Sequence, residues 1–581
     1  MSNTYDLELG QILDQARKDE LQLQSQSDDS RENAQEYRAR SQNKSESPAE
    51  PEPEPERPVE DITLQPPSSS SCEDPNATGN ENDNDLGQTP TSLSTVEARR
   101  VKSLFPTSPS NPRNWSEKRK MTLTIALALT GFIATAGSSI GIPGIHSVRD
   151  EFNVGFRVGV LIPGAYVLGQ GLGPFIFAPF SELYGRQPSY IFAEALYCVF
   201  FLATGFSNNI TTLIILRFFC GMFGSVAPSL GVATCADMYV PEERGKPISI
   251  YALGPLSGPI FGNMLGYWLL HLGWRWAYYF LTILSTLNFV LLSVVMKETY
   301  APAIQKILTF HSTRPSTKKS YNHFNPLGWI PDLSWMRSMV SPSEMLTVYT
   351  RAFSRPPRLL FSNPVAFAFS MYYAYLYGII YLFLTTLPLL FGRPPFSQSD
   401  LFSYQWTQNV LPLAYLAIGL GFFSTVIIAA NYQDKIYKYL SLKNGDKGQP
   451  EYRLVLTQIG MILLPIGLFI YGWTADSQTH WIAPIIGQYI IGVGLVLPFN
   501  TIQNFLVDAF HPYSAAAIAG ATASRSIVAC ILPLFATEMF VNLGWGWGNT
   551  LLACVAILGI PCPFIMFLCG KRLRERYAFH G

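Results

Sequence analysis

Residues 157–180 read RVGVLIPGAYVLGQGLGPFIFAPF, a run with a single charged side chain, Arg157, at its beginning. A helix of about 20 apolar residues is long enough to cross the ~30 Å hydrocarbon core of a bilayer. Eleven further runs of similar character lie near residues 121–142, 189–206, 210–236, 247–270, 277–296, 363–391, 409–430, 452–473, 481–507, 514–541 and 549–570. Two or three buried helices of a soluble protein can mimic such runs, but twelve in series predict a polytopic membrane protein.

The composition agrees with a membrane protein. Of the 581 residues 48% are hydrophobic and only 14% are charged, about half the usual share of a soluble domain. Lys and Arg balance Asp and Glu at 41 each, so no attraction to nucleic acid is indicated. The eight cysteines form no Cys-x-x-Cys pair, and therefore neither a disulfide framework nor a zinc site is expected.

Positive charges in the short connections predict the orientation, because Lys and Arg collect on the cytoplasmic side of membrane proteins. With the N-terminus inside, the outer side keeps only Arg149, Arg157, Arg275 and Arg393. The inner side takes the clusters that begin at Arg113, Arg186, Arg244, Lys435 and Lys571 and most of the central polar segment. We therefore expect both termini in the cytoplasm and the plasma membrane as the location.

Six runs, a polar interval and six more runs predict an all-α membrane protein of two six-helix bundles. We expect a disordered cytoplasmic tail at 1–119, bundles at 120–297 and 363–570, a cytoplasmic loop at 298–362 and a cytoplasmic tail at 571–581. Internal symmetry supports the duplication, because Asp237 ends the fourth run and Asp508 ends the tenth. Such a duplication usually places a substrate cavity between the halves, near the membrane midplane.

The connection after the second run reads Ala178-Pro-Phe-Ser-Glu-Leu-Tyr-Gly-Arg-Gln187. It resembles the signature loop of the major facilitator superfamily, and the chain from about 109 to 577 resembles the fungal twelve-helix drug/proton antiporters, which include polyamine exporters. The resemblance implies the major facilitator fold and a conformational latch made by Glu182, Gly185 and Arg186 with Asp237, Glu243 and Arg244. Ala178, Glu182 and Gln187 depart from the superfamily pattern and leave fewer charges. A loop that only fixes orientation is the alternative.

Arg217 lies seven residues inside the fourth run, or ~10 Å deep in a helix. A guanidinium is costly in lipid and normally faces the interior of the bundle, although snorkelling to the outer surface is the alternative. The residue matches the Arg-x-x-x-Gly motif of the resembled family, which implies a part in proton coupling.

The fifth run contains glycines at four-residue spacing and two prolines: Gly254, Pro255, Gly258, Pro259, Gly262 and Gly266. Small residues at this spacing allow close helix packing, and an internal proline kinks a helix. The pattern resembles the antiporter motif of the superfamily, which implies export. Asn263 stands where fungal relatives usually have proline, and general small-residue packing is the alternative.

Polar side chains inside the runs are candidates for the substrate cavity. In the seventh run Tyr373, Tyr377 and Tyr381 share one helix face, which can offer ring surfaces and hydroxyls to a ligand, although core packing is the alternative for each. Further uncharged candidates are Gln170, Asn263, Gln488, Asn500 and Gln503.

Proton coupling needs an ionisable group within the membrane. Lipid favours the neutral form of a carboxylate, so an acid within a span can take up and release a proton. Glu194 and Asp508, together with Arg217, are the candidates for proton coupling, and Glu538 is a weaker one. The alternative is that Glu194 and Glu538 lie near the membrane surfaces and carry no proton.

The leading hypothesis is therefore a proton-coupled exporter of amphipathic xenobiotics, toxins, secondary metabolites or polyamines. No Gly-x-x-x-x-Gly-Lys-Ser/Thr loop occurs, so the proton gradient rather than ATP is the expected energy source, without any cofactor or metal. The partners expected are a small-molecule substrate, protons and lipid, with a monomeric chain. An uptake carrier and a transport-inactive receptor are the alternatives, and an enzyme is not expected because the histidines are scattered.

Overall fold

The computed structural model describes residues 101–577, apart from 104, 241–242, 244, 314–341, 395–400, 446–447 and 511–512. These residues are almost entirely helical. The expected disordered tail lies largely outside the described residues. The long helices of the first half are α3 (Glu117–Ser139), α5 (Phe156–Tyr184), α6 (Arg186–Gly205), α7 (Ile210–Gly224), α8 (Val226–Met238), α9 (Gly245–Leu269) and α10 (Trp274–Val295). Those of the second half are α14 (Pro364–Phe391), α15 (Ala414–Lys443), α16 (Val455–Asp476), α17 (Ile482–Ala509), α18 (Ser514–Gly559) and α19 (Pro561–Arg576).

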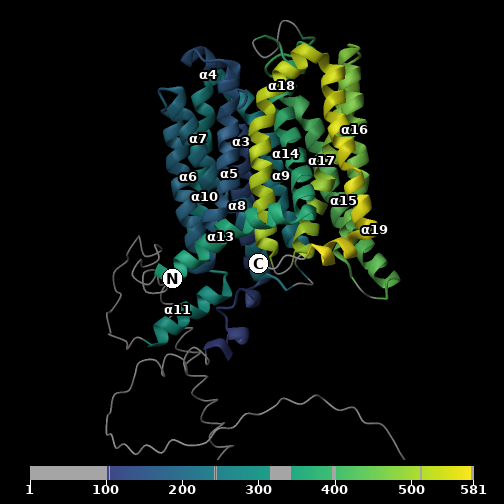
Figure 1. Ribbon diagram of the computed structural model, residues 1–581. Helices are drawn as coiled ribbons and strands as arrows, with labels where there is room; N and C mark the ends of the chain where they lie inside the picture. Colours follow the sequence, from purple (N-terminus) through teal and green to yellow (C-terminus); the bar gives the residue numbers. More distant parts are fainter. Residues whose placement is uncertain are drawn as a thin grey trace, which may run out of the picture. The chain divides into compact units, whose positions relative to one another are not determined.

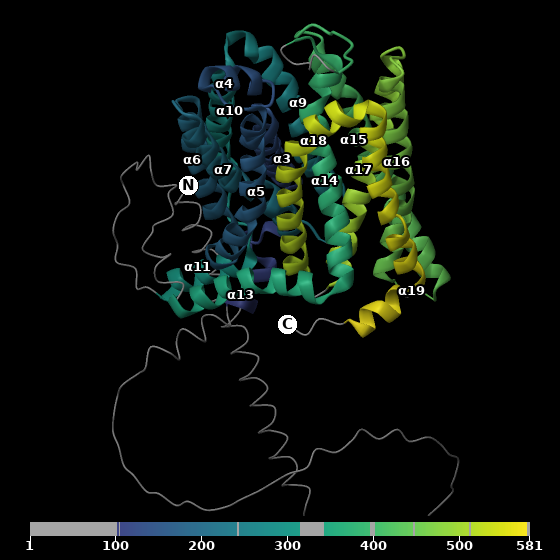
Figure 2. The same cartoon turned by 45° about the horizontal axis from the view of Figure 1, so that its top comes forward.

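Ten helical stretches of the described chain are long and apolar enough to cross a bilayer. The last stretch, Ser514–Gly570, turns back at Gly544, whose φ of 76° and ψ of 174° are not helical, and it therefore crosses twice (Figure 2). The 25-residue α9 packs along α3 and adds one more crossing. The twelve spans predicted from the sequence are thus confirmed, with α7 and α8 together forming the fourth.

Local sequence explains where several spans begin. The Asn363 side chain accepts hydrogen bonds from the N–H groups of Val365 and Ala366, while Pro364 at the first helical position has no N–H to satisfy. Asn209 caps α7 in the same way through the N–H of Thr212. These caps supply acceptors to N–H groups that a helix leaves without intrahelical partners.

The two halves lie side by side in Figure 1, and α3 begins at the same face where α19 ends. That face carries α11 (Ala301–Thr313) and α13 (Pro342–Ser362), and we call it the α13 face. The opposite face carries the short helix α4 (Ile145–Phe152), and we call it the α4 face. Where the structure describes it, the segment expected as a loop at 298–362 is therefore mostly helical, over α11 and α13.

Helix α13 contacts both halves along the α13 face. Phe353 stacks on Phe175 of α5 with ring centroids 5.7 Å apart, and the Tyr349 hydroxyl donates to the carbonyl of Ile176. On the other side, Gly520 of α18 lies against Pro356. The second part of the connection between the halves is thus an ordered helix that packs against both of them.

The halves meet mainly along α5 with α18 and α9 with α15. The hydrogen bonds that join them in the described residues lie between the α4 face and the middle of the spans. At the α4 face, Arg157 of α5 pairs with Glu538 of α18, and His271 hydrogen-bonds Asn409 at 2.8 Å. The deepest bond joins Tyr377 of α14 to Gln170 in the middle of α5. The two halves are therefore fastened together toward the α4 face.

Candidate functional site

The loop between α5 and α6 is organised around Arg186. Its Nε donates to a carboxylate oxygen of Asp237 at the end of α8, 3.2 Å away, and its Nη1 donates to the Ser181 hydroxyl at 2.6 Å. The guanidinium also lies 4.9 Å from the ring centroid of Tyr300. The structure thus brings together Arg186 and Asp237, the two charges that the latch hypothesis pairs across the loop.

The other latch candidates have different environments. Glu182 is exposed, and Glu243 is exposed in the turn after α8. Arg244 lies outside the described residues. The expected charge network is therefore represented in the structure chiefly by the pair of Arg186 and Asp237.

Glu298, which follows α10, packs against this loop and is not among the site residues predicted from the sequence. Its buried carboxylate accepts hydrogen bonds from the backbone N–H groups of Arg186, Gln187, Thr299 and Tyr300 at 2.8–3.1 Å. The first two N–H groups begin α6, where an anion also meets the positive end of the helix dipole. Burial raises the pKa of the Glu298 carboxyl, and the four N–H donors act in the opposite direction.

Gly185 makes room for this carboxylate. Its φ of 101° is a conformation that favours glycine, and a Cβ placed there would lie 2.3 Å from Glu298 Oε2. The glycine of the signature loop therefore serves both the turn and the close approach of the Glu298 side chain.

Replacing Glu298 by alanine is expected to destabilise the protein by about 3 kcal/mol or more, because four backbone donors lose their acceptor and each unsatisfied buried group costs ~1–3 kcal/mol. Thermal unfolding in detergent measures this. Glu538→Gln, which removes an exposed ion pair at the α4 face, is the control and should leave the melting temperature close to that of the unmodified protein. Equal melting temperatures for Glu298→Ala and the control would contradict the assignment.

The second half contains a related ion pair. Arg453, just before α16, pairs with Asp508 at the end of α17 and with Asp434 of α15, each at 3.1 Å. In the first half, Arg186 begins α6 and its partner Asp237 ends α8, so the two pairs occupy corresponding places in the halves. Asp508, expected as a proton carrier, instead lies exposed at the α13 face, because it stands one residue before the end of α17.

Arg217 of α7 is fully buried against α3. Its Nη2 donates to the carbonyl of Gly137 at 2.7 Å and more weakly to that of Ser138 at 3.4 Å. Its guanidinium carbon lies 4.6–5.5 Å from three ring centroids, those of Tyr166, Phe201 and Tyr278. No carboxylate among the described residues pairs with it. The snorkelling alternative is wrong, because the side chain has 0% exposure.

Glu194 lies inside the first half, with 7% of its surface exposed. Its carboxylate accepts a hydrogen bond from Asn288 Nδ2 at 3.0 Å, and the same amide nitrogen is 3.1 Å from the Thr130 hydroxyl. Of the three buried acids of the described residues, Glu298 follows α10 and Glu451 precedes α16. Glu194 is the one in the middle of a span, whereas Glu538 is exposed at the α4 face.

The tyrosine face of α14 points at residues of both halves. Tyr377 donates to Gln170 Oε1 of α5 and Tyr373 to Gln503 Oε1 of α17, each at 3.4 Å. Tyr381 donates to the Ser138 hydroxyl at 2.7 Å, next to the carbonyl that Arg217 contacts. Five of the eight candidates for the substrate cavity are thus joined to one another or to the neighbourhood of Arg217.

The remaining three candidates lie apart from this group. Asn263 Nδ2 is 3.4 Å from the carbonyl of Leu384, and Gln488 is fully buried one to two turns inside the α4 end of α17. Asn500 is partly accessible on α17, next to Phe499.

Arg525 of α18 was missed by the sequence reasoning and lies at the centre of the tyrosine face. Its Nη1 donates to the Tyr373 hydroxyl at 3.0 Å, and its guanidinium carbon is 4.7 Å from the ring centroid of Tyr377. Phe499 stacks on Tyr373 at 4.3 Å and is the third aromatic ring around the Arg525 guanidinium. We call Tyr373, Tyr377, Phe499, Gln503 and Arg525 the central cluster. A lone arginine in an apolar run was the signal that could have revealed it, as it did for Arg217.

The glycines of α9 pack against α3. A Cβ at Gly254 would lie 1.9 Å from the carbonyl oxygen of Ala128, and one at Gly266 would lie 2.4 Å from that of Ile140. Gly258 and Gly262 face the same helix, and Pro255 lies against Gly131 of α3. Pro255 and Pro259 are inside α9. The candidate antiporter motif therefore forms the close contact between the first and fifth spans.

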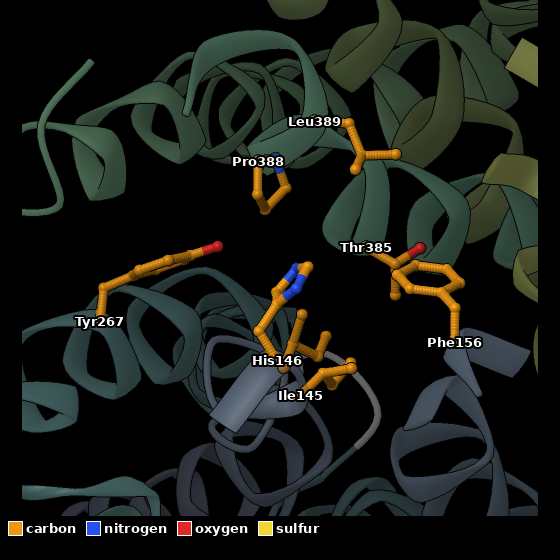
Figure 3. A pocket seen from close by; sticks show the side chains of 8 residues that line it. Ile145, His146, Phe156, Tyr267, Thr385, Pro388 and Leu389 are labelled. Atoms are coloured by element: carbon orange, nitrogen blue, oxygen red, sulfur yellow. The ribbon is translucent and has the colours of Figure 1, made fainter. Parts of the chain in front are cut away.

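A small pocket lies between the halves at the α4 face (Figure 3). The imidazole of His146 sits between Tyr267 of α9 and Phe156 of α5, with Thr385 and Pro388 of α14 on its far side. Burial and the nearby Arg149 lower the pKa of His146 to about 4, so that the ring is neutral at neutral pH. The pocket is therefore uncharged and mostly apolar.

Comparison with known proteins agrees with this architecture. The family model of the Major Facilitator Superfamily matches residues 127–533. The chain is 36% identical over 476 residues to the MFS-type transporter penM of Penicillium rubens, covering 82% of this chain and 89% of that protein. It is 32% identical to the efflux pump radE of Floropilus chiversii, covering 82% and 84%. This chain belongs to the major facilitator superfamily.

Solved structures show the same fold. The proton:xylose symporter XylE bound to 6-bromo-6-deoxy-D-glucose matches with a TM-score of 0.53 and 14% identity, covering 78% of this chain and 96% of that one. With the fungal relatives, the fold and the twelve spans identify the chain as a multi-pass membrane transporter rather than an enzyme.

Proposed function

We propose that this transporter exports small amphipathic organic compounds, such as xenobiotics or secondary metabolites, in exchange for protons. The observation that carries the proposal is Glu194, the carboxylate buried in mid-span beside Asn288. A carboxylate in lipid is stable as the neutral acid and must reach water to release its proton, so its titration can be tied to the alternation of access.

The glycine pattern of α9 favours export, because it resembles the antiporter motif. Its close contacts with α3 fit both that motif and general small-residue packing. The name of the relative radE, an efflux pump, agrees with this direction. We place the α13 face in the cytoplasm, since the lysines and arginines of the short connections gather there, and we place the protein in the plasma membrane as a monomer. An uptake carrier and a transport-inactive receptor remain the competing proposals.

A chain of contacts supports coupling between protons and substrate. Arg217 contacts the carbonyl of Ser138, and the Ser138 hydroxyl accepts from Tyr381, whose ring lies 5.2 Å from that of Tyr377. Tyr377 in turn flanks Arg525. Glu194 reaches α3 through Asn288 and Thr130, so a change in its protonation can shift α3 relative to α14 and reach the central cluster.

The test is proton flux in proteoliposomes that contain pyranine, after addition of a panel of naphthalene carboxylates, amides and amines and of spermine. We expect at least one compound to drive proton movement with the unmodified protein and none with Glu194→Gln. Glu194→Gln should still exchange labelled compound across the membrane, because exchange needs no net proton transfer. Unchanged proton flux in Glu194→Gln would rule out this acid as the carrier, and binding without any flux would support the receptor.

A further inference from the structure

We propose that the central cluster selects anionic aromatic substrates, those with a carboxylate or phenolate, and rejects amines and polyamines. The inference deepens the proposed function and rests on it, with the central cluster as the place where the transported compound binds.

Arg525 sits deep in the membrane. It is eleven residues from the first residue of α18, which places it ~16 Å from that end of the helix. Phe499 is ten residues from the end of α17 and lies at a similar depth of ~15 Å. Although both are in mid-span, their side chains are partly accessible, as are those of Tyr377 and Gln503. A molecule at this level can therefore reach part of the Arg525 side chain, although its Nε is covered in this structure.

No acid neutralises Arg525 within the described residues. The described carboxylates of the second half all lie at the two faces. Asp434 and Asp508 pair with Arg453 at the α13 face, where Glu451 also lies beside Gly570. Asp476 accepts from the N–H of Gly546 and Glu538 pairs with Arg157, both at the α4 face. The neighbours of Arg525 are tyrosines, a phenylalanine and an amide, none of which is negatively charged at neutral pH.

The hydrogen bonds of the guanidinium are also incomplete. Nη1 donates to Tyr373, but Nε is buried and has no partner in the described part of the protein. Nε and its neighbouring Nη2 form the edge that pairs with both oxygens of a carboxylate. A cation in a dry setting is costly when unpaired, so an anionic ligand that completes this edge is favoured over a neutral one, and a cationic ligand is repelled.

The rings around Arg525 indicate the rest of the ligand. Phe499 stacks on the buried ring of Tyr373 at 4.3 Å and on the ring of Tyr377 at 5.9 Å, and the partly accessible Phe499 and Tyr377 offer ring faces to a ligand. An aromatic ring bound against these faces would bring an attached carboxylate to Arg525. The charge and the shape of the cluster therefore point to the same class of molecule.

The test uses three probes of nearly equal size at neutral pH: 2-naphthoate, 2-naphthamide and 2-naphthylmethylamine, with spermine as a fourth. The full chain in nanodiscs is titrated by calorimetry, with empty nanodiscs correcting for partition into lipid. We expect naphthoate to bind at least about tenfold more tightly than the amide, and both amines to bind more weakly than the amide. Arg525→Gln should remove the preference for naphthoate and leave amide binding within about twofold, while Arg525→Lys should retain part of it.

Lys438→Gln removes a positive charge from an exposed position of the same half and serves as the matched control, with the preference unchanged. Equal affinities for naphthoate and naphthamide, tighter binding of either amine, or no naphthoate binding would overturn the proposal. An equal loss of all probes in Arg525→Gln would show a structural role and would also overturn it. Selectivity for naphthoate without proton flux would instead leave the inference standing and reject only the proton antiport.

Discussion

Replacing Arg217 by lysine is expected to lower the initial rate of transport by roughly a hundredfold, although the positive charge is kept. The guanidinium contacts two carbonyl groups of α3 and three aromatic rings at once, a pattern that requires its flat and extended shape. The lysine ammonium is compact and strongly hydrated, and at a site with 0% exposure it would hold one carbonyl group at most. The contact between α7 and the end of α3 would then no longer be maintained.

The measurement is uptake into inverted vesicles driven by a proton gradient, with the amount of folded protein checked by size-exclusion chromatography. Arg393→Gln is the control, because its side chain is exposed at the α4 face and donates to the carbonyl of Gln405 within the same half, so the rate should change by less than about twofold. The assignment also requires that substrate binding by Arg217→Lys stays close to normal. A rate above half of that of the unmodified protein would contradict a role of Arg217 in coupling.

The sequence was sufficient for the spans and for part of the loop after α5. Twelve long apolar runs can satisfy their backbone groups in lipid only as helices, so their number and order follow from hydrophobicity alone. The pair of Arg186 and Asp237 followed from its resemblance to a known motif. The amphipathic helix α13 escaped notice because the central segment was judged by its polarity and not by its helical periodicity.

Some residues were misplaced or missed because their roles depend on tertiary structure. Arg525 was missed because the argument applied to one arginine in an apolar run was not applied to the other. Glu298 is 112 residues from Arg186, and its role appears only when the end of α10 meets the start of α6. The end of the tenth run was predicted within two residues of the end of α17, but the sequence did not show that Asp508 pairs there with Arg453 at the α13 face. Arg525 stands in a run of small residues, and the argument applied to Arg217 would have identified it.

Gly254→Ala is expected to destabilise the protein by about 3 kcal/mol or more and to abolish transport, which is a large effect for one methyl group. The added carbon would lie 1.9 Å from the carbonyl oxygen of Ala128, and backbone atoms of a packed helix cannot move aside without displacing α3. Thermal unfolding in detergent and vesicle transport measure the two effects. Gly155→Ala is the matched control, because its Cβ would meet nothing within 4 Å, and it should remain near normal in both measurements.

Gly258, one turn further along α9, tests whether close packing alone explains why these positions are glycine. A Cβ at Gly258 would lie 1.9 Å from the hydroxyl oxygen of Thr135, a side-chain atom, with the nearest backbone atoms at 2.7 Å. Gly258→Ala should therefore regain part of its lost stability, about 1 kcal/mol, when combined with Thr135→Ala, since the closest obstacle is removed. No side-chain change can relieve Gly254→Ala in this way, because its obstacle is backbone. If Thr135→Ala gave no rescue, or if Gly254→Ala were as stable as Gly155→Ala, close packing of α9 on α3 would not explain these glycines.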